Sequence, residues 1–374
     1  MLVSLHRYFS KARNILKLVR QGVIDRWRLH SLAGSIQWLY GPTTLSTNPT
    51  EAIVLCVVKD SEILIEAFIE HYLSTGFKHI FFLDNGSTDR TVNIIKTYSQ
   101  TTVVRSERPF KDYYVVFKNY LIQQFGEGKW CLVADIDEFL HLPLRRRLQQ
   151  TLSYLNHHQY DTVCVQMLDM FSAEGIALTK ENNPSANDGN ICLSLSALKA
   201  KFRYYDLSSV RQTAYIRSFV AAPPAGLKFA YGGIRKAVFN SSCFLTKEAL
   251  FYTYARHGLG RLLPKLRYLE SSHLLFSTPF SRVKLADFSA LFLHYKFIDG
   301  FYAATQTAVL AENHWNSSRE YKAYQQVMAK TKAKSQKLVL KHSTTQALEE
   351  MNTLVEQGFL FASEQFRQAE PSSL

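Results

Sequence analysis

The pattern between residues 52 and 134 constrains the fold more than any other feature of this chain. Short, almost wholly apolar segments alternate there with segments of helical periodicity. The apolar segments are Ala52–Val58, His79–Leu83, Val103–Val104 and Trp130–Ala134, and the helical ones are 62–74, 88–98 and 112–125. Strands that are apolar on both faces are typical of a parallel sheet covered by helices on each side. The sequence therefore predicts an α/β fold with a mostly parallel central sheet.

The rest of the chain is less regular. It predicts further strands at Thr162–Leu168 and Ala290–His294, a hairpin at Lys228–Phe239, and helix from Ala303 to near the C-terminus. Residues 41–50 are rich in Pro, Thr and Ser, as is typical of a linker. We therefore divide the chain into a basic helical segment at 1–45, a central α/β domain at 50–310 and a helical extension at 311–374.

The composition limits the class of protein. With 374 residues, of which 47% are apolar, the chain can bury a large core and is not disordered. Its net charge of +13 favours contact with polyanions, namely nucleic acid, anionic lipid or phosphorylated substrates. The five cysteines are scattered, without a Cys-x-x-Cys pair, which favours a reducing compartment over a disulfide framework or a zinc knuckle. Since no apolar run is long enough to span a bilayer or to form a secretory signal, we expect a cytoplasmic protein.

The first forty residues are basic and weakly amphipathic. Seven lysines and arginines alternate there with apolar residues, against the single acid Asp25. A helix of this kind suits the anionic inner face of a membrane, to which the protein would bind peripherally. In the alternative, the helix packs on the main domain and its basic face is solvated. Both interpretations remain open at this point.

Three acids follow the strand expected at Trp130–Ala134, in the stretch KWCLVADIDEFLHLPL. They are Asp135, Asp137 and Glu138. Alternate residues of an extended segment point to the same side, so the two aspartates can converge on one point, where their charges require a cation. Mg²⁺ or Mn²⁺, held by carboxylates and by substrate phosphates, meets that need. In the alternative, Asp137 or Glu138 caps a helix that starts near Phe139, but the preceding apolar strand favours the metal site.

Two other strand ends carry polar residues. In LDNGSTDRT, Asp84 ends the second strand and can accept hydrogen bonds from a ribose or a base. Taken alone, an Asn-Gly turn followed by a helix cap explains the same residues better. In VVKDSE, after the first strand, Lys59 and Glu62 fit a cradle for a nucleobase, although ordinary loop polarity also accounts for them.

Together, these stretches resemble a known family. VVKDSEILIEAFIEHYLSTGFKHIFFLDNGSTDRT, followed about forty residues later by WCLVADIDEFL, is similar to family-2-like glycosyltransferases of the GT-A fold, in the branch with a D-[IV]-DEF motif. The resemblance is close over residues 52–142 and looser through KFAYGGIRKAVF, LTKEALF and LFLHYKF to about residue 325. It implies a GT-A catalytic domain over 50–310, a UDP- or GDP-sugar donor, and Mn²⁺ or Mg²⁺ as cofactor.

The resemblance also implies roles for particular residues by position. Asp84 is expected to contact the nucleoside, Asp135 to lie near the ribose and the metal, and Asp137 to ligate the metal. His294, at the end of an apolar segment, is the third ligand candidate, and Lys296 then faces the phosphates. A histidine satisfied within the core is the alternative.

The acceptor side is less well defined. Arg235 and Lys236 are candidates for binding phosphate or an acidic acceptor, unless they are ordinary solvated charges. An inverting transferase also needs a carboxylate near the acceptor hydroxyl as general base. The Glu-Asp pair that many members of the family carry is missing from the expected region. The candidates are Glu270, Asp169 and Glu174, with Glu270 slightly favoured over Asp169.

The leading hypothesis is thus a metal-dependent, inverting glycosyltransferase that acts on a glycan or lipid-linked glycan acceptor. A nucleotidyltransferase is the neighbouring alternative, but it typically has a glycine-rich phosphate loop where this chain has VVKDSEI. A nucleic-acid-binding protein is disfavoured, since the chain has no zinc, RNP-like or helix-turn-helix signature and its strand ends are acidic. A non-catalytic sugar- or polyanion-binding protein is the last alternative, and the intact Asp135 and Asp137 argue against it.

Overall fold

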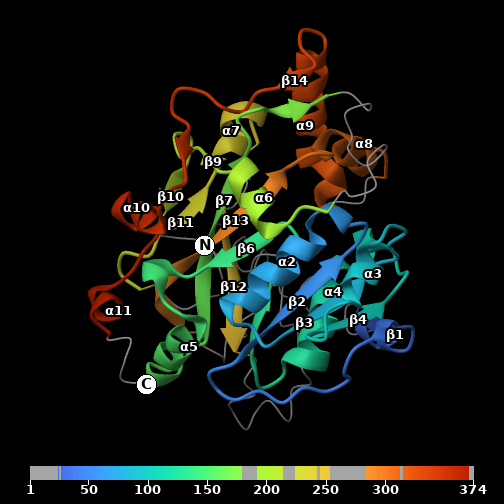
Figure 1. Cartoon of the computed structure of the whole chain (residues 1–374), viewed down its shortest axis with the longest axis vertical. Helices are drawn as coiled ribbons and strands as arrows, with labels where there is room; N and C mark the ends of the chain where they lie inside the picture. The colour runs from blue at the N-terminus through green and yellow to red at the C-terminus, as the bar shows by residue number, and fades with distance from the viewer. Residues whose placement is uncertain are drawn as a thin grey trace, which may run out of the picture.

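The computed structural model describes residues 24, 27–178, 192–213, 224–241, 245–252, 284–311 and 315–369, and the fold below is that of these residues. Within them, eleven strands form one sheet (Figure 1). Its main path runs through β1 (Gln37–Tyr40), β4 (Thr101–Arg105), β3 (His79–Asp84), β2 (Ala52–Val58), β5 (Trp130–Val133), β12 (Thr246–Tyr252), β7 (Thr162–Phe171), β13 (Leu285–Phe297) and β6 (Glu138–His141). Two short strands extend it beside β7, namely β9 (Tyr204–Tyr205) and then β15 (Gln346–Ala347).

Smaller elements complete the described part of the chain. Two separate strand pairs join β10 (Arg211–Thr213) to β11 (Phe229–Tyr231) and β8 (Ile176–Ala177) to β14 (Lys337–Leu338). The helices are α2 (Glu62–Thr75), α3 (Thr91–Ile95), α4 (Phe110–Leu121) with a π-helical continuation at Ile122–Gly126, α5 (Leu148–His157), α6 (Leu195–Lys201), α7 (Ile234–Phe239), α8 (Phe301–Ala311), α9 (Trp315–Lys332), α10 (Met351–Glu356) and α11 (Glu364–Gln368), besides a 3-10 turn at Pro143–Arg145.

The sheet combines parallel and antiparallel pairs. β4, β3, β2 and β5 are parallel neighbours, and so are β7 and β13. β1, β12 and β6 run antiparallel to the strands beside them. The predicted α/β class, with parallel strands flanked by helices, is confirmed. The register places Val58 beside Asp84 and Asp84 beside Arg105, so these carboxyl ends lie along one edge.

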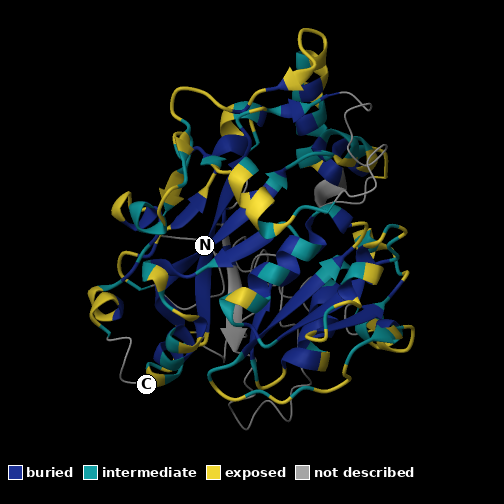
Figure 2. Cartoon of the chain, viewed as in Figure 1, coloured by how far each residue is buried: buried dark blue, intermediate teal, exposed yellow. Residues whose placement is uncertain are grey.

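Helices cover both faces of the parallel strands because those strands are apolar on both sides. Alternate residues of β2 enter different core clusters: Val54 shares one with Phe68 of α2, and Ile53 shares the other with Phe117 of α4. Figure 2 shows the buried residues along the central strands and the exposed ones on the outer surfaces. Full burial of a large apolar side chain stabilises the folded state by roughly 1.5–3 kcal/mol. The apolar residues on both faces of these strands therefore place the sheet between two layers of helices.

The hairpin predicted at 228–239 is wrong in its second half. β11 pairs with β10 instead, and the segment IRKAVF forms α7. Gly232 and Gly233 both have positive φ angles, of +98° and +63°, and turn the chain into this helix. The N–H of Lys236 then donates to the Gly233 carbonyl. A Cβ at Gly232 would lie 2.6 Å from the Ser209 carbonyl oxygen, so the turn requires glycine.

The amino-terminal segment differs from the prediction. Residues 27–33 are helical, but β1 follows and pairs with β4, so part of the segment predicted at 1–45 belongs to the sheet. Residues 1–23, on which the membrane hypothesis mainly depends, lie outside the described residues. Within the described part, no helix has the length and apolar character needed to cross a bilayer.

The carboxyl-terminal segment is not purely helical either. After α8 and α9, the chain adds β14 and β15 to two sheets before α10 and α11. Leu354, Phe359 and Phe366 belong to the same core cluster as the central strands. Residues 311–369 therefore complete the main core, where the sequence predicted a helical extension.

Candidate functional site

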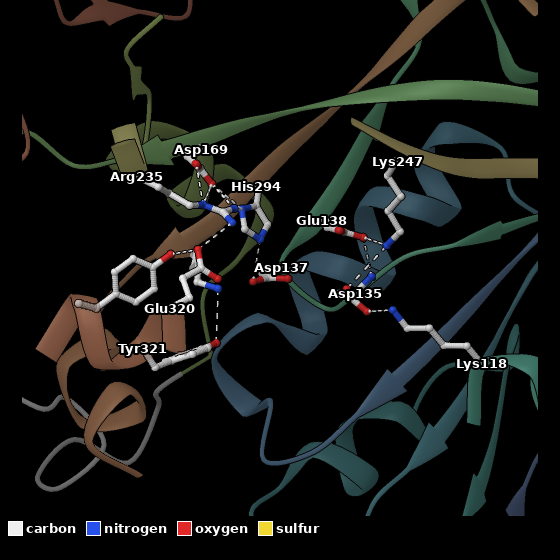
Figure 3. A network of polar contacts seen from close by, with 12 residues as sticks. Lys118, Asp135, Asp137, Glu138, Asp169, Arg235, Lys247, His294, Glu320 and Tyr321 are labelled. Atoms are coloured by element: carbon white, nitrogen blue, oxygen red, sulfur yellow. Dashed lines mark hydrogen bonds and ion pairs between the residues drawn. The ribbon is translucent and has the colours of Figure 1, made fainter. Parts of the chain in front are cut away.

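Five charged residues that the sequence singled out lie near the carboxyl ends of β5, β7 and β13, in two neighbouring clusters (Figure 3). The strand register explains part of this, because His294 of β13 lies beside Asp169 of β7 on one side and beside Glu138 of β6 on the other. The N–H of Tyr295 also donates to the Asp137 carbonyl at 2.8 Å, which ties the turn after β5 to β13. The five residues are Asp135, Asp137, Asp169, Arg235 and His294.

The turn after β5 separates the two aspartates of the DID stretch. The N–H of Glu138 donates to the Asp135 carbonyl at 3.0 Å, and the N–H of Asp135 donates to the Glu138 carboxylate at 2.8 Å. Residues 136–137 form a turn and β6 starts at Glu138, so the segment is neither extended nor the start of a helix. The expectation that Asp135 and Asp137 converge on one point is therefore wrong. Figure 3 shows Asp137 directed at His294 and Asp135 directed at two lysines.

His294 lies between two carboxylates. Its Nε2 is 3.1 Å from Asp137 Oδ2, and its Nδ1 is 2.6 Å from Asp169 Oδ1. Burial disfavours the charged imidazole, but these two carboxylates outweigh it and raise the pKa of His294 to about 9. A protonated His294 therefore donates to both acids and offsets one of their two negative charges.

Arg235 fixes Asp169 on the side away from Asp137. Its Nη2 and Nε donate to the two oxygens of Asp169 at 2.7 and 2.9 Å, and its Nη1 lies 3.3 Å from Glu320 Oε1. Burial alone would raise the pKa of Asp169, but Arg235 and His294 hold it well below its usual range. A buried carboxylate with two cationic partners is a weak base. The geometry therefore favours an orienting role for Asp169 over the catalytic role that the sequence suggested.

The Nδ1 atom of His294 has two competing contacts. Besides Asp169, it lies 2.7 Å from Nη2 of Arg235. Arginine can only donate, so this contact requires a bare Nδ1, whereas the contact to Asp169 requires a proton there. With the proton on Nδ1, a neutral His294 directs the lone pair of Nε2 toward Asp137. A carboxylate that holds a histidine in this way is the usual arrangement behind a metal ligand.

Asp135 belongs to a second cluster, with two lysines that the sequence analysis missed. Lys118 Nζ lies 2.6 Å from Asp135 Oδ1, and Lys247 Nζ lies 3.7 Å from Asp135 Oδ2 and 2.6 Å from Glu138 Oε2. The side chains of Lys118 and Lys247 are 4% and 1% exposed, whereas that of Asp135 is 40% exposed. Burial disfavours the charged amine, but Asp135 and Glu138 raise the pKa of Lys247 above its ordinary value. The sequence held a signal for it, a lysine inside the strand-like run LTKEALF.

Lys296, on β13, lies beside the cluster formed by Asp137, Asp169, Arg235 and His294. Its Nζ lies 3.4 Å from the Tyr321 hydroxyl and 4.8 Å from the centre of that ring. Burial lowers its pKa, but Tyr321 and Glu320 outweigh this and raise it. Lys296 in turn helps to lower the pKa of Glu320 to about 2, against the effect of burial. Lys296 is therefore a fixed cation whose charge helps to lower the pKa of Asp137. Its role at the phosphates stays a prediction.

The metal predicted at Asp135, Asp137 and His294 fits two of these residues. Asp137 and His294 face each other across 3.1 Å, and Asp169 orients the imidazole. Asp135 is paired with the lysines instead, and the described residues contain no group of three His, Cys, Asp or Glu that could hold a metal ion. A carboxylate and an imidazole suit a cation that takes its remaining ligands from water and phosphate. Since Mg²⁺ prefers oxygen ligands, the pair favours Mn²⁺ of the two candidates.

The residues predicted at the nucleoside are largely satisfied by the protein. Asp84 is fully buried, and its carboxylate accepts hydrogen bonds from the Ser87 N–H at 3.1 Å and from Arg105 Nε at 2.7 Å. Glu62 pairs with Arg90. The structure thus supports the alternative for Asp84 and Glu62, in which these acids organise the loops after the strands.

The same two loops are joined by further hydrogen bonds. Asp60 accepts one from the Thr88 N–H at 2.7 Å, and Thr91 accepts one from the Ser61 N–H at 2.7 Å. Lys59 directly precedes Asp60 and Ser61 in the chain, and its side chain is exposed. Among Lys59, Glu62 and Asp84, Lys59 is therefore the residue whose side chain the structure leaves exposed.

The remaining candidates do not join the cluster. Lys236 is exposed on α7, and its Nζ donates to the Asn240 side chain. Glu174 is exposed in the turn that follows β7. Glu270, the preferred general base, lies outside the described residues. Glu320 of α9, which the sequence analysis missed, takes part in the cluster through Arg235.

A scan against protein-family models found no match, and a search of curated proteins found none. Any function assigned to the cluster therefore depends on its geometry and on the sequence motifs.

Proposed function

We propose that this protein is a metal-dependent glycosyltransferase of the GT-A fold that uses a UDP- or GDP-sugar. The observation that carries the proposal is the pairing of Asp137 with His294, which Asp169 orients, at the carboxyl ends of parallel strands. Ligands of open α/β sheets bind at that edge. The motifs that resemble family-2-like glycosyltransferases point to the same place.

The residues around this pair suit the departure of a nucleoside diphosphate. Asp137 and His294 would hold Mn²⁺, and the bound ion would stabilise the charge that develops on the leaving diphosphate. Lys296 presents a second positive charge close to Asp137, held by Tyr321 and Glu320. Arg235 is enclosed by Asp169, His294 and Glu320, so it keeps the imidazole in place and does not bind phosphate itself.

We further propose an inverting reaction on a glycan or lipid-linked glycan. The general base belongs to the acceptor side, where Glu270 remains the preferred residue. A net charge of +13 favours binding to the anionic inner face of a membrane and to phosphorylated donors. Nucleic acid is not expected as a partner, because the strand ends that form the site are acidic.

Calorimetric titration of UDP and of GDP tests this proposal. We expect one nucleotide to bind with Mn²⁺ present, and its affinity to fall at least about tenfold without metal or in Asp137→Asn. Asp112→Asn is the matched control, because this aspartate is exposed on α4 and pairs only loosely with Arg28 at 3.6 Å. Equal binding by wild type and Asp137→Asn would contradict the proposed metal site. Absence of all nucleotide binding would favour the non-catalytic alternative.

A further inference from the structure

The turn that joins α9 to β14 is strongly basic. From residue 321 to residue 348 the sequence contains six lysines and no aspartate, glutamate or arginine. Five of these lysines are exposed between residues 330 and 341, on the last turn of α9, in the connecting turn and in and after β14. The basic tip, as we call this surface, consists of Lys330, Lys332, Lys334, Lys337 and Lys341.

The core beneath the basic tip holds its shape. β14 pairs with β8, and Leu338 and Leu340 are buried in an apolar cluster that they share with α9. The residues that alternate with these leucines are exposed, namely Lys337, Val339 and Lys341. Figure 1 shows the turn between α9 and β14 at one end of the molecule, and Figure 2 shows that its surface is exposed.

We propose that the basic tip docks on the anionic surface of a lipid membrane. Lysines gathered on one projecting turn can approach such a surface together, and each contributes to binding there. Val339 adds an apolar side chain that is 57% exposed between two of the lysines. Lys332 Nζ also lies 3.4 Å from the hydroxyl of Tyr302. Lysines beside apolar and tyrosine side chains are typical of protein surfaces that enter the headgroup region.

The composition of the basic tip favours lipid over nucleic acid, the other common polyanion. Nucleic-acid sites rely on arginine for bidentate contacts to phosphates and bases, and the stretch 321–348 has none. Lysine carries a compact charge, which suits attraction to a charged surface without defined geometry. Glu174 is an exposed acid in the turn before β8, and it offsets one of the five positive charges.

Helix α9 connects the basic tip to the candidate metal site. Near its start, Glu320 contacts Arg235, and Tyr321 contacts Lys296. Lys332 follows twelve residues later, so the basic tip lies about 18 Å along the helix from these contacts. Docking would therefore hold the site within reach of a lipid-linked glycan acceptor. This consequence rests on the proposed function, whereas the docking itself does not depend on the metal site.

Co-sedimentation of the full chain with lipid vesicles tests the inference. We expect binding to vesicles of phosphatidylcholine mixed with phosphatidylserine, but not to phosphatidylcholine alone, and weaker binding at high salt. Neutralising the tip in Lys330→Gln/Lys334→Gln/Lys337→Gln should weaken binding at least about tenfold. The matched control, Lys96→Gln/Lys111→Gln/Lys228→Gln, removes the same charge from other exposed positions and should weaken it less than about threefold.

A substitution at Val339 tests contact with the lipid separately from charge. Val339→Trp should tighten vesicle binding roughly threefold or more, because tryptophan favours the membrane interface and this side chain is exposed. An unchanged affinity would contradict insertion of the tip. The basic residues of the first forty positions are intact in every variant, so binding through them would be equal in all.

Three results would overturn the inference. The tip variant could bind anionic vesicles as well as its control does, which would place the contact elsewhere on the chain. The wild type could fail to bind anionic vesicles at all. The tip variant could lose binding to a single-stranded oligonucleotide while it keeps binding to vesicles, which would make the tip a nucleic-acid surface. Failure of the proposed transferase activity would appear in donor consumption without vesicles and would leave the vesicle result intact.

Discussion

Lys247 and Glu138 form a buried ion pair whose single and joint removal should have very different effects on stability. The two charged atoms are 2.6 Å apart, and the side chains are 1% and 3% exposed. Replacing Lys247 by methionine keeps the volume but removes the cation that faces the buried Glu138 carboxylate. Removing one member of a buried pair typically costs about 3–5 kcal/mol, whereas replacing both is often close to neutral.

Without Lys247, Glu138 can take up a proton instead of staying charged. The loss of folding stability therefore cannot exceed the free energy of that protonation. Burial already raises the pKa of Glu138, against the effect of Lys247. From an ordinary glutamate pKa of about 4.3, protonation costs about 4 kcal/mol at pH 7.5 and about 1.6 kcal/mol at pH 5.5. In Lys247→Met the folded state holds the proton more tightly than the unfolded state does. The loss of stability relative to wild type should therefore shrink as the pH falls.

Urea denaturation at pH 7.5, 6.5 and 5.5 measures this directly. We expect the free energy of unfolding of Lys247→Met to be lower than that of the wild type by about 4 kcal/mol at pH 7.5 and by less than about 2 kcal/mol at pH 5.5. The double variant Lys247→Met/Glu138→Gln should recover at least about 2 kcal/mol at pH 7.5 and show little pH dependence. A loss below about 1 kcal/mol, or one that does not change with pH, would refute the argument that the pair is buried and charged.

Three further predictions concern other parts of the molecule. Burial lowers the pKa of His71 to about 4, so this side chain takes up a proton on unfolding below pH about 6.5. The free energy of unfolding should therefore fall by up to about 3 kcal/mol between pH 6.5 and 4. In urea titrations, His71→Gln should show a smaller change of this free energy with pH. Asp169→Asn should weaken Mn²⁺ binding roughly 10–100-fold in calorimetry, since it releases the imidazole that it orients; unchanged binding would exclude that role. Gly41→Ala should lower the free energy of unfolding by more than about 2 kcal/mol, because φ is +86° and a Cβ would lie 2.3 Å from the Thr101 carbonyl oxygen. Gly86→Ala, with φ of +76° in open space, should cost only about 1 kcal/mol, and equal losses would contradict this reasoning.

The parallel strands and their helices were predictable because local sequence determines them. Ala52–Val58 was expected and found as β2 with the same bounds, and α2 ends one residue beyond its prediction. A seven-residue apolar run bounded by polar and turn residues favours a buried strand over a helix. At the end of α2, Gly76 adopts a φ of +102° and stops the helix.

The turn that carries the site was not predictable in the same way. The strand ending at Ala134 was foreseen, but the directions of Asp135 and Asp137 depend on the hydrogen bond between the Asp135 N–H and the Glu138 carboxylate. An extended segment and a tight turn are equally compatible with DIDEF. The choice between them comes from the antiparallel pairing of β6 with β13, which lies about 150 residues later in the chain.

The contacts of Lys247 were not predictable either, because they join segments that are distant in sequence. β12 inserts between β5 and β7 and so brings Lys247 to Glu138, 109 residues away. Nothing in the local pattern of LTKEALF indicates that neighbour. Asp169 and His294 were both candidates from sequence, but their contact, and the way Arg235 holds them, follows from the parallel register of β7 and β13.

Release of nucleoside diphosphate from a panel of UDP- and GDP-sugars, with Mn²⁺ and the purified full chain, tests the proposed function most directly. We predict that one donor is consumed in a Mn²⁺-dependent reaction, which Asp137→Asn slows at least about a hundredfold and Asp112→Asn leaves unchanged. Consumption of no donor, or equal rates in Asp137→Asn and wild type, would contradict the assignment of this cluster as the metal site of a glycosyltransferase.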